Sequence, residues 1–354
     1  MATLPIHGSR PRILIVRLTA IGDVIHGMPL LCALRNRFPH AHLAWVTEGR
    51  SGDLLDGHGA LDALIRIERK WLKSPRQVVD LRRRLKRERF DVTIDIQGLT
   101  KSAVAARLTG APHRVGFAGR DGRELSRYLN NCLVLPASTH VIDRGLELLQ
   151  PLGIEHPRVD FQVPESATAA RSVEQWLTAS NCKKPFAVVI PGAGWPSKVW
   201  PAERFGQVAG HLRSTHGMPV VVVWAGQTEL AMAHQVVTAS GGTTLLAPHT
   251  TLPELAALLR RARLAVASDT GPLHLAVAVA TASVGLFGPM PRERNGPYGS
   301  PHVALQRQSI DGTSRQRRGA TDATMRAISV DDVCTACDRL LAGKAPRSGS
   351  RSVA

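Results

Sequence analysis

The stretch Leu264-Ala-Val-Ala-Ser-Asp-Thr-Gly-Pro-Leu-His-Leu-Ala276 predicts the fold more directly than any other part of the chain. Its apolar start, 264–267, is typical of a buried strand in a parallel sheet, and residues 268–272 predict a tight turn into a helix. Thr270 can cap that helix, and Gly271 lets the main chain approach a ligand closely. The N–H groups and dipole of a helix start attract anions. We therefore expect a phosphate-bearing ligand here, although α/β proteins also contain such turns for purely structural reasons.

The rest of the chain repeats this pattern of a strand followed by a helix. Predicted strands span 12–18, 41–47, 63–67 and 90–97 in the first half, and 186–190, 219–224, 243–247, 264–267 and 283–287 in the second. Short connections between such units indicate parallel, doubly wound sheets, and 354 residues exceed one typical core. A change to Pro-, Ser- and Lys-rich sequence places the domain boundary near residue 165. We predict two parallel-sheet domains, 1–165 and 166–342, with a ligand-binding cleft between their strand ends, and a disordered tail, 343–354.

Three helical or polar segments are less regular. Apolar residues recur at helical spacing from 24 to 38, but Pro29 interrupts them, so this helix is either kinked or begins after Asp23. Residues 307–326 are polar and rich in arginine, and they predict a long loop. The segment 330–341 predicts a helix whose apolar face includes Cys334 and Cys337. That interpretation is favoured over a zinc site, because no second ligand pair follows.

The chain is strongly basic, with 45 Lys and Arg against 28 Asp and Glu and a net charge of +17. Such a charge implies an acidic partner. Residues 66–89 alone hold eleven Lys or Arg and three acids. This concentration favours a surface that faces an anion over an ordinary solvated helix face. Trp71 is the one aromatic residue in its middle and does not make a base-stacking platform, so we expect no nucleic-acid partner.

Cysteine content and hydropathy suggest the compartment. Five scattered cysteines, an odd number, predict reduced thiols. Residues 1–12 lack the apolar core of a signal peptide, and no run of eighteen apolar residues occurs. We therefore expect a cytoplasmic protein whose basic faces favour association with an anionic membrane surface.

Three groups of motifs carry a resemblance to a known family. They are Arg17-Leu-Thr-Ala-Ile-Gly-Asp-Val-Ile-His-Gly-Met-Pro29, Asp91-Val-Thr-Ile-Asp-Ile-Gln-Gly-Leu-Thr-Lys-Ser102, and the set 191–205, 269–276 and Gly288-Pro289. In order and spacing they resemble the ADP-heptose:lipopolysaccharide heptosyltransferases of glycosyltransferase family 9, and heptosyltransferase I most closely. The resemblance implies a GT-B fold, which is α/β with two Rossmann-like domains facing a central cleft.

The same resemblance implies an inverting, metal-independent transfer of heptose from ADP-heptose to a Kdo residue of the lipopolysaccharide inner core. The first domain would bind the anionic lipid A–Kdo acceptor and the second the nucleotide sugar, with no further cofactor. The enzyme would work at the cytoplasmic face of the inner membrane. Asp23 matches the family's catalytic base, with helix capping as its structural alternative and Asp95 as an internal rival for the role.

Other residues match the family's binding sites. For the donor, Lys198 matches a lysine that contacts the diphosphate, and Asp269, Thr270, Gly271 and His274 match the rest of the site. A histidine one turn into a helix also commonly packs against its sheet. Either Glu229 or Gln227 would hold the ribose. The positions that would face the acceptor are Arg69, Lys70, Lys73 and Arg123, with Gln97 and Lys101 at the end of the strand 90–97.

Three other functions stay open from the sequence. A GT-B enzyme with a different nucleotide sugar or acceptor, such as another glycosyltransferase or an epimerase, predicts the same fold without a basic acceptor surface. A nucleic-acid-binding protein is suggested by charge alone, and no recognised readout module is present. A non-catalytic member of the fold is expected to lack Asp23 or Lys198, and both are present.

Overall fold

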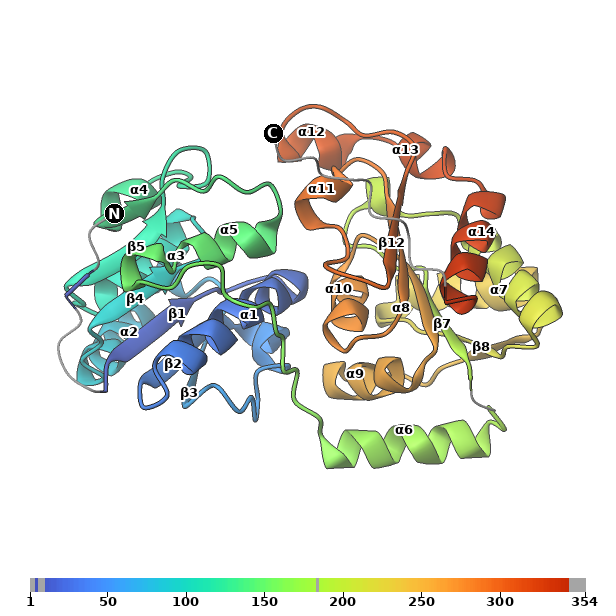
Figure 1. Ribbon diagram of the computed structural model, residues 1–354, viewed down its shortest axis with the longest axis horizontal. Coiled ribbons are helices and arrows are strands. Elements are labelled where there is room, and N and C mark those ends of the chain that lie inside the picture. The colour runs from blue at the N-terminus through green and yellow to red at the C-terminus, as the bar shows by residue number, and fades with distance from the viewer. Residues whose placement is uncertain (1–3, 6–9, 183–184, 344–354) are drawn as a thin grey trace. The chain divides into compact units, whose positions relative to one another are not determined.

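The computed structural model describes residues 4–5, 10–182 and 185–343. The chain divides into two compact units, of which the first ends at Pro164 and the second begins at Glu165. Each unit contains a six-stranded sheet in which every neighbouring pair of strands is parallel (Figure 1). The two parallel sheets confirm the predicted α/β class. None of the described helices is both long and apolar enough to cross a membrane.

The sheet of the N-terminal unit has the order β3-β2-β1-β4-β5-β6. Its strands are β1 (Arg12–Val16), β2 (His42–Glu48), β3 (Ala63–Ile67), β4 (Val92–Asp95), β5 (His113–Phe117) and β6 (Cys132–Val134). The helices are α1 (Ile21–Arg37), α2 (Pro75–Arg87), α3 (Thr100–Leu108), α4 (Ser126–Leu129) and α5 (Val141–Glu147), with short 3-10 turns η1 (Gly49–Gly52), η2 (Trp71–Lys73) and η3 (Gln150–Leu152). From β1 the strand order continues outward to β3 on one side, and from β4 it continues outward to β6 on the other side. The order of successive strands therefore changes direction between β1 and β4. The carboxyl ends of these two strands are therefore where a ligand is expected in such a fold.

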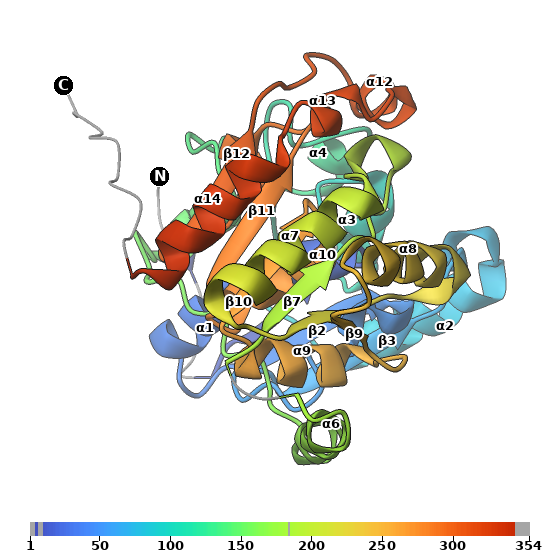
Figure 2. The same cartoon turned by 90° about the vertical axis from the view of Figure 1, so that its right-hand side faces the viewer.

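The sheet of the C-terminal unit has the order β12-β11-β10-β7-β8-β9. Its strands are β7 (Ala187–Ile190), β8 (Val220–Val222), β9 (Thr244–Leu246), β10 (Leu264–Ser268), β11 (Ser283–Phe287) and β12 (His302–Gln306). The longer helices are α6 (Ala167–Ala179), α7 (Ala202–His216), α8 (Gly226–Ala239), α9 (Leu252–Arg261), α10 (Gly271–Ala278) and α14 (Val330–Leu341). The short ones are η4 (Pro196–Lys198), α11 (Arg292–Asn295), α12 (Ser314–Gly319) and α13 (Ala323–Arg326). Here the reversal lies between β7 and β10, and Figure 2 shows α7 and α14 side by side across one face of this sheet.

Each unit has its own apolar core. In the N-terminal unit, the face of α2 that carries Leu81 and Leu85 is buried together with Trp71, so the exposed side of α2 carries its positive charges. In the C-terminal unit, Trp200 and Phe205 pack edge to face with ring centroids 4.9 Å apart. Burial of such side chains is the main favourable term in folding. It also fixes the strand ends that carry the polar residues described below.

Several predicted elements differ from the observed ones. Helix α1 begins at Ile21 and continues through Pro29, so of the two alternatives for this segment the start after Asp23 is wrong. The segment 307–326 is not one loop, because α12 and α13 form there. Thr313 starts α12 with a capping box in which Gln316 is its partner. The strands β5, β6 and β12 were not predicted.

Two further predictions concern the C-terminal end of the chain. The segment 330–341 forms α14, and both Cys334 and Cys337 are buried on it, which confirms the apolar helix face. The predicted disordered tail falls, from residue 344 onward, outside the described residues.

Candidate functional site

The carboxyl end of β1 carries the predicted base, Asp23, in the first turn of α1 rather than on the preceding turn. Its Oδ2 accepts a hydrogen bond from the main-chain N–H of Ala20 at 3.0 Å, so the capping interaction that was the structural alternative is present. Its Oδ1 lies 2.5 Å from a guanidinium nitrogen of Arg17. The Asp23 side chain is nevertheless 42% exposed, whereas that of Arg17 is 12% exposed. The carboxylate is thus held in place and still accessible.

The rival carboxylate, Asp95, is fully buried at the end of β4. Its Oδ1 accepts hydrogen bonds from the N–H groups of Gln97 and Gly98, at 3.0 and 3.1 Å, and its Oδ2 accepts one from Asn130 at 3.2 Å. Burial raises the pKa of Asp95 in spite of these hydrogen bonds. These hydrogen bonds show that Asp95 builds the turn after β4, and its side chain, unlike that of Asp23, is not exposed.

Gln97 ties the strand ends of the N-terminal unit together. The side chain is buried, and its Oε1 accepts a hydrogen bond from the N–H of Leu18 at 2.8 Å. The N–H of Glu48, at the end of β2, donates to the carbonyl of Leu18 at 2.9 Å. The turns after β1, β2 and β4 are therefore linked through Leu18. In this position Gln97 holds the backbone that leads to Asp23 and is not an exposed contact for an acceptor.

The predicted acceptor cations fall into two groups. Lys101, on α3, has its Nζ 2.9 Å from the buried carboxylate of Glu48, so its charge is already paired. Four others are exposed: Arg69, Lys70, Lys73 and Arg123. Arg123 also donates to the main-chain carbonyl of Gln97 at 3.4 Å, which places it beside the linked turns.

In the C-terminal unit, Asp269 follows β10 and gathers polar side chains around it. Lys198 Nζ lies 2.6 Å from Asp269 Oδ2, and Asn295 donates to Oδ1 at 2.6 Å. His274 Nε2 lies 3.4 Å from the same Oδ1. Burial alone would raise the pKa of Asp269, but His274 and Lys198 outweigh it and lower the pKa to about 2. The carboxylate is therefore ionised and balances the charge of Lys198.

Thr270 and Gly271 begin helix α10 as predicted, but Thr270 does not cap it. Its Oγ1 is buried and, among the residues that the structure describes, has no hydrogen-bond partner. The Thr270 side chain therefore does not occupy the first N–H groups of α10. These groups and the helix dipole make this end of α10 suited to an anion, as the sequence predicts.

A second cation, Arg318, shares an aromatic platform with Lys198. The Lys198 Nζ lies 4.3 Å from the ring centroid of Trp195, and the Arg318 Cζ lies 4.6 Å from it. Ser197 anchors α12 here by donating from its hydroxyl to the carbonyl of Arg317 at 2.8 Å. The sequence does not predict Arg318 or Asn295 in the site, because the polar segment 307–326 predicts a loop and Asn295 belongs to none of the motifs.

Glu229 lies in the first turn of α8 and accepts a hydrogen bond from the N–H of Ala225 at 2.8 Å. It is directed at the turn after β7, where a Cβ built on Gly192 would come within 2.2 Å of the Glu229 carboxyl carbon. Burial raises the pKa of Glu229. Gln227 on the same turn of helix is exposed. Between the two residues proposed for the ribose, Glu229 is the one held against a strand end.

Together these residues place an accessible carboxylate in one unit and a paired lysine beside a helix start in the other. Both lie at carboxyl ends of parallel strands, where side chains and helix starts converge. A carboxylate can accept a proton from a hydroxyl, and lysine, arginine and helix N–H groups can bind phosphate. Among the described residues, the one group with the spacing of metal ligands contains none of these site residues.

Comparisons with known proteins identify the family of the chain. The family model for "Glycosyltransferase family 9 (heptosyltransferase)" matches residues 78–321, which is more than half of the chain. Lipopolysaccharide heptosyltransferase 1 of Pseudomonas aeruginosa is 28% identical over 303 residues, covering 83% of each chain. Lipopolysaccharide heptosyltransferase 3 of Escherichia coli K12 is 24% identical over 273 residues, covering 75% of this chain and 79% of the other.

A solved structure extends the comparison to the fold. The E. coli heptosyltransferase WaaC with ADP has a TM-score of 0.72 and 23% identity, and the match covers 94% of this chain and 99% of that one. The likeness agrees with the two parallel six-stranded sheets and shows a GT-B fold. The chain belongs to glycosyltransferase family 9, the heptosyltransferase family, and is a glycosyltransferase.

Proposed function

We propose that this glycosyltransferase moves heptose from ADP-heptose to a Kdo residue of the lipopolysaccharide inner core. The observation that carries the proposal is the pairing of Lys198 with Asp269 beside the start of α10. A point charge and a helix start at one strand end suit the diphosphate of a nucleotide sugar. The similarity to heptosyltransferase 1 supports heptose as the sugar, and the related structure with ADP supports adenosine diphosphate as its carrier.

The proposed reaction needs one base and one stabilised leaving group. Asp23 takes the proton from the acceptor hydroxyl, and the oxygen of that hydroxyl forms a bond to the anomeric carbon of heptose. The bond between the anomeric carbon and the phosphate oxygen breaks on the opposite face, and ADP leaves with the electron pair. Lys198 and the N–H groups of α10 stabilise the negative charge that develops on the diphosphate. The displacement inverts the anomeric configuration and uses no metal or further cofactor.

The remaining residues would bind and orient the substrates. In the C-terminal unit, Asp269 with His274 holds Lys198, Gly271 and Thr270 line the helix start, and Glu229 accepts from the ribose hydroxyls. In the N-terminal unit, the exposed cations Arg69, Lys70, Lys73 and Arg123 face the carboxylate of Kdo and the phosphates of lipid A. Such an acceptor lies in a membrane, so we place the enzyme at the cytoplasmic face of the inner membrane.

A different acceptor is the second candidate, because heptosyltransferase 3 is nearly as similar as heptosyltransferase 1, at 24% against 28% identity. The two candidates share the donor and the chemistry, and differ in whether the accepting sugar is Kdo or a heptose already in the core. An enzyme that uses another nucleotide sugar forms a third possibility with the same fold.

The test measures ADP release from ADP-heptose by the full chain, with three additions: Kdo–lipid A, the same acceptor already carrying one heptose, and no acceptor. Release that depends on Kdo–lipid A supports the proposal. Release only with the heptose-bearing acceptor indicates the second candidate function, in which the accepting sugar is a heptose already in the core. If neither acceptor stimulates release, while a panel of other nucleotide sugars yields turnover, the heptose assignment is wrong.

A further inference from the structure

Three side chains that the transferase site does not use converge at the end of α7. His211 and His216 come from the last two turns of that helix, and Asp338 comes from α14. The Nε2 atoms of the two histidines lie 2.9 and 2.7 Å from the same Oδ1 of Asp338. All three potential ligand atoms lie within 4.8 Å of one another.

The chemistry of this cluster suits a cation. Imidazole nitrogens and a carboxylate oxygen form a ligand set that binds zinc and similar divalent ions. The three groups stand at the C-terminal end of α7, where the helix dipole is negative and favours a positive charge. The Oγ1 of Thr215 lies 3.4 Å from the Nδ1 of His211, which is where a second group that orients a metal-binding histidine is expected.

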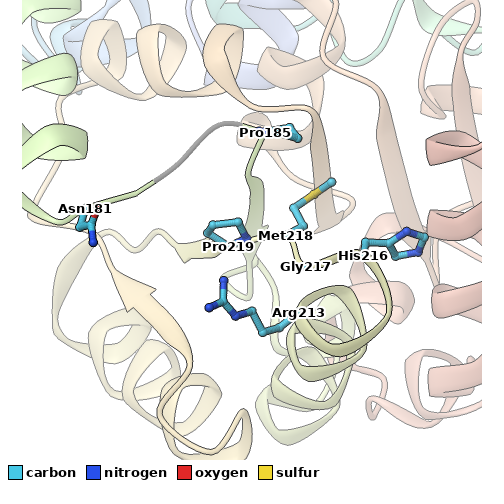
Figure 3. A pocket seen from close by; sticks show the side chains of 7 residues that line it. All are labelled: Asn181, Pro185, Arg213, His216, Gly217, Met218 and Pro219. Carbon is cyan, nitrogen blue, oxygen red and sulfur yellow. The ribbon is translucent and has the colours of Figure 1, made fainter.

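The cluster is accessible and directed between the two helices. The side chains of His211, His216 and Asp338 are 28%, 25% and 42% exposed, so an ion and its water can reach them. Figure 3 shows the ring of His216 turned toward the red ribbon of α14, whereas Arg213 and Met218 point elsewhere in the neighbouring pocket. That pocket, of about 420 Å³, shares His216 with the cluster, and neither His211 nor Asp338 lines it.

We propose that His211, His216 and Asp338 form a binding site for a divalent transition cation of the zinc type, which joins α7 to α14. The proposal goes beyond the transferase function and does not depend on it. Bonds of about 2.0–2.2 Å from Zn²⁺ to each ligand require each histidine nitrogen to move away from the Asp338 oxygen by roughly half an ångström. Small rotations of partly exposed side chains can provide this movement. Solvent fills the remaining coordination positions.

The neighbouring cysteines are a competing ligand set. Cys334 lies one turn before Asp338 on α14, and burial together with the charge of Asp338 raises the pKa of its thiol to about 11. Neither Cys334 nor Cys337 belongs to the group of ligand atoms that lie within 4.8 Å of one another. We therefore assign the site to the two histidines and the carboxylate, and the experiment includes a readout that separates the two sets.

The experiment uses the full chain after treatment with a chelator, titrated with ZnCl₂ in a calorimeter and with CoCl₂ in a spectrophotometer. The expected result is one ion per chain and an unfolding midpoint that rises on adding Zn²⁺. His211→Ala, His216→Ala and Asp338→Asn should each weaken binding by at least about tenfold and abolish the rise. His234→Ala, which removes an exposed histidine on α8, is the matched control and should behave as the wild type.

Several results would overturn the proposal. Absence of stoichiometric binding to the wild type is one, and equal binding by the wild type and all three variants is another, because it places the ion elsewhere. A near-ultraviolet thiolate-to-cobalt band would assign the ion to cysteine. Asp338→Asn keeps the size and shape of the side chain, so circular dichroism and metal-free melting of this variant distinguish loss of a ligand from loss of the fold.

Discussion

Lys198 Nζ lies 2.6 Å from Asp269 Oδ2, and the two side chains are only 13% and 3% exposed. The lysine proposed to meet the diphosphate therefore has a carboxylate partner before any donor binds. The two further partners of Asp269, His274 and Asn295, both contact its Oδ1, so Oδ2 has Lys198 as its partner. The pair holds a cation ready in a partly buried place where a phosphate group interacts more strongly than in bulk water.

Replacing Lys198 should affect both binding and stability. We expect Lys198→Met to weaken ADP binding at least about tenfold, since one charge-assisted contact is worth roughly 1.5–3 kcal/mol. It should also lower the free energy of unfolding by about 3 kcal/mol, because it leaves a buried carboxylate with fewer partners. Calorimetry with ADP and urea unfolding measure the two effects. Lys198→Arg, which keeps the charge, is the control, and equal ADP binding by the Met variant and the wild type would remove Lys198 from the donor site.

The pKa of Asp269 predicts how stability depends on acid. Because the folded-state pKa, about 2, lies below the ordinary value of 3.8, the ionised form is stabilised in the folded chain. This contribution, about 2 kcal/mol, is complete above pH 4 and is lost as the pH falls from about 4 to 2. Asp269→Asn should therefore flatten this part of the stability curve. Urea unfolding at pH 2.5, 3, 4 and 6 measures it, and an unchanged slope in the variant would contradict the assignment.

The two carboxylates of the N-terminal unit should respond differently to amide substitution. Asp23→Asn keeps an oxygen that can accept from Ala20 and so should fold normally. Loss of the base is expected to lower kcat by about 10²–10⁴ while ADP binding stays unchanged. Stopped assays with saturating donor and acceptor measure kcat, and circular dichroism checks the fold. A variant with full activity would show that Asp23 is only a helix cap.

Asp95→Asn is the counterpart. Its buried carboxylate accepts three hydrogen bonds through two oxygens, and an amide in its place offers one acceptor oxygen instead of two. We expect a loss of stability of about 1–3 kcal/mol, with kcat per folded molecule close to that of the wild type. Melting curves and active-fraction measurements separate these quantities. A folded but inactive Asp95→Asn enzyme would move the base to Asp95.

The sequence predicted the fold well where strands are apolar and central. The run 264–267 and the strand 283–287 are buried on both faces of their sheet and were found by hydrophobicity alone. The three strands that were not predicted lie toward the sheet edges. β6 has three residues, and β5 and β12 contain polar residues such as Arg114 and His302, so they lack a long apolar run.

The candidate site was predictable only as far as it is local. The turn 268–272 could be recognised as a helix start because neighbouring residues form it. The pairing of Lys198 with Asp269 joins residues 71 apart, and it requires that β7 lie next to β10, which short-range patterns do not specify. The contribution of Arg318 depends in the same way on where α12 packs. The absence of a cap bond from Thr270 is decided by side-chain placement and not by residue type.

A single methyl group on Gly192 should test the proposed role of Glu229. The Cβ of Gly192→Ala would approach the Glu229 carboxyl carbon to 2.2 Å, a distance at which the carboxylate must move. If Glu229 holds the ribose, KM for the donor rises about tenfold or more while kcat at saturation changes little, because uniform binding is lost. Gly194→Ala is the matched control, since a Cβ there meets no atom within 4 Å and the glycine lies in the same turn. Initial rates against donor concentration measure both variants. Equal KM values for the two variants and the wild type would exclude Glu229 as a ribose contact and leave Gln227, which Gly192→Ala does not touch, as the next residue to replace.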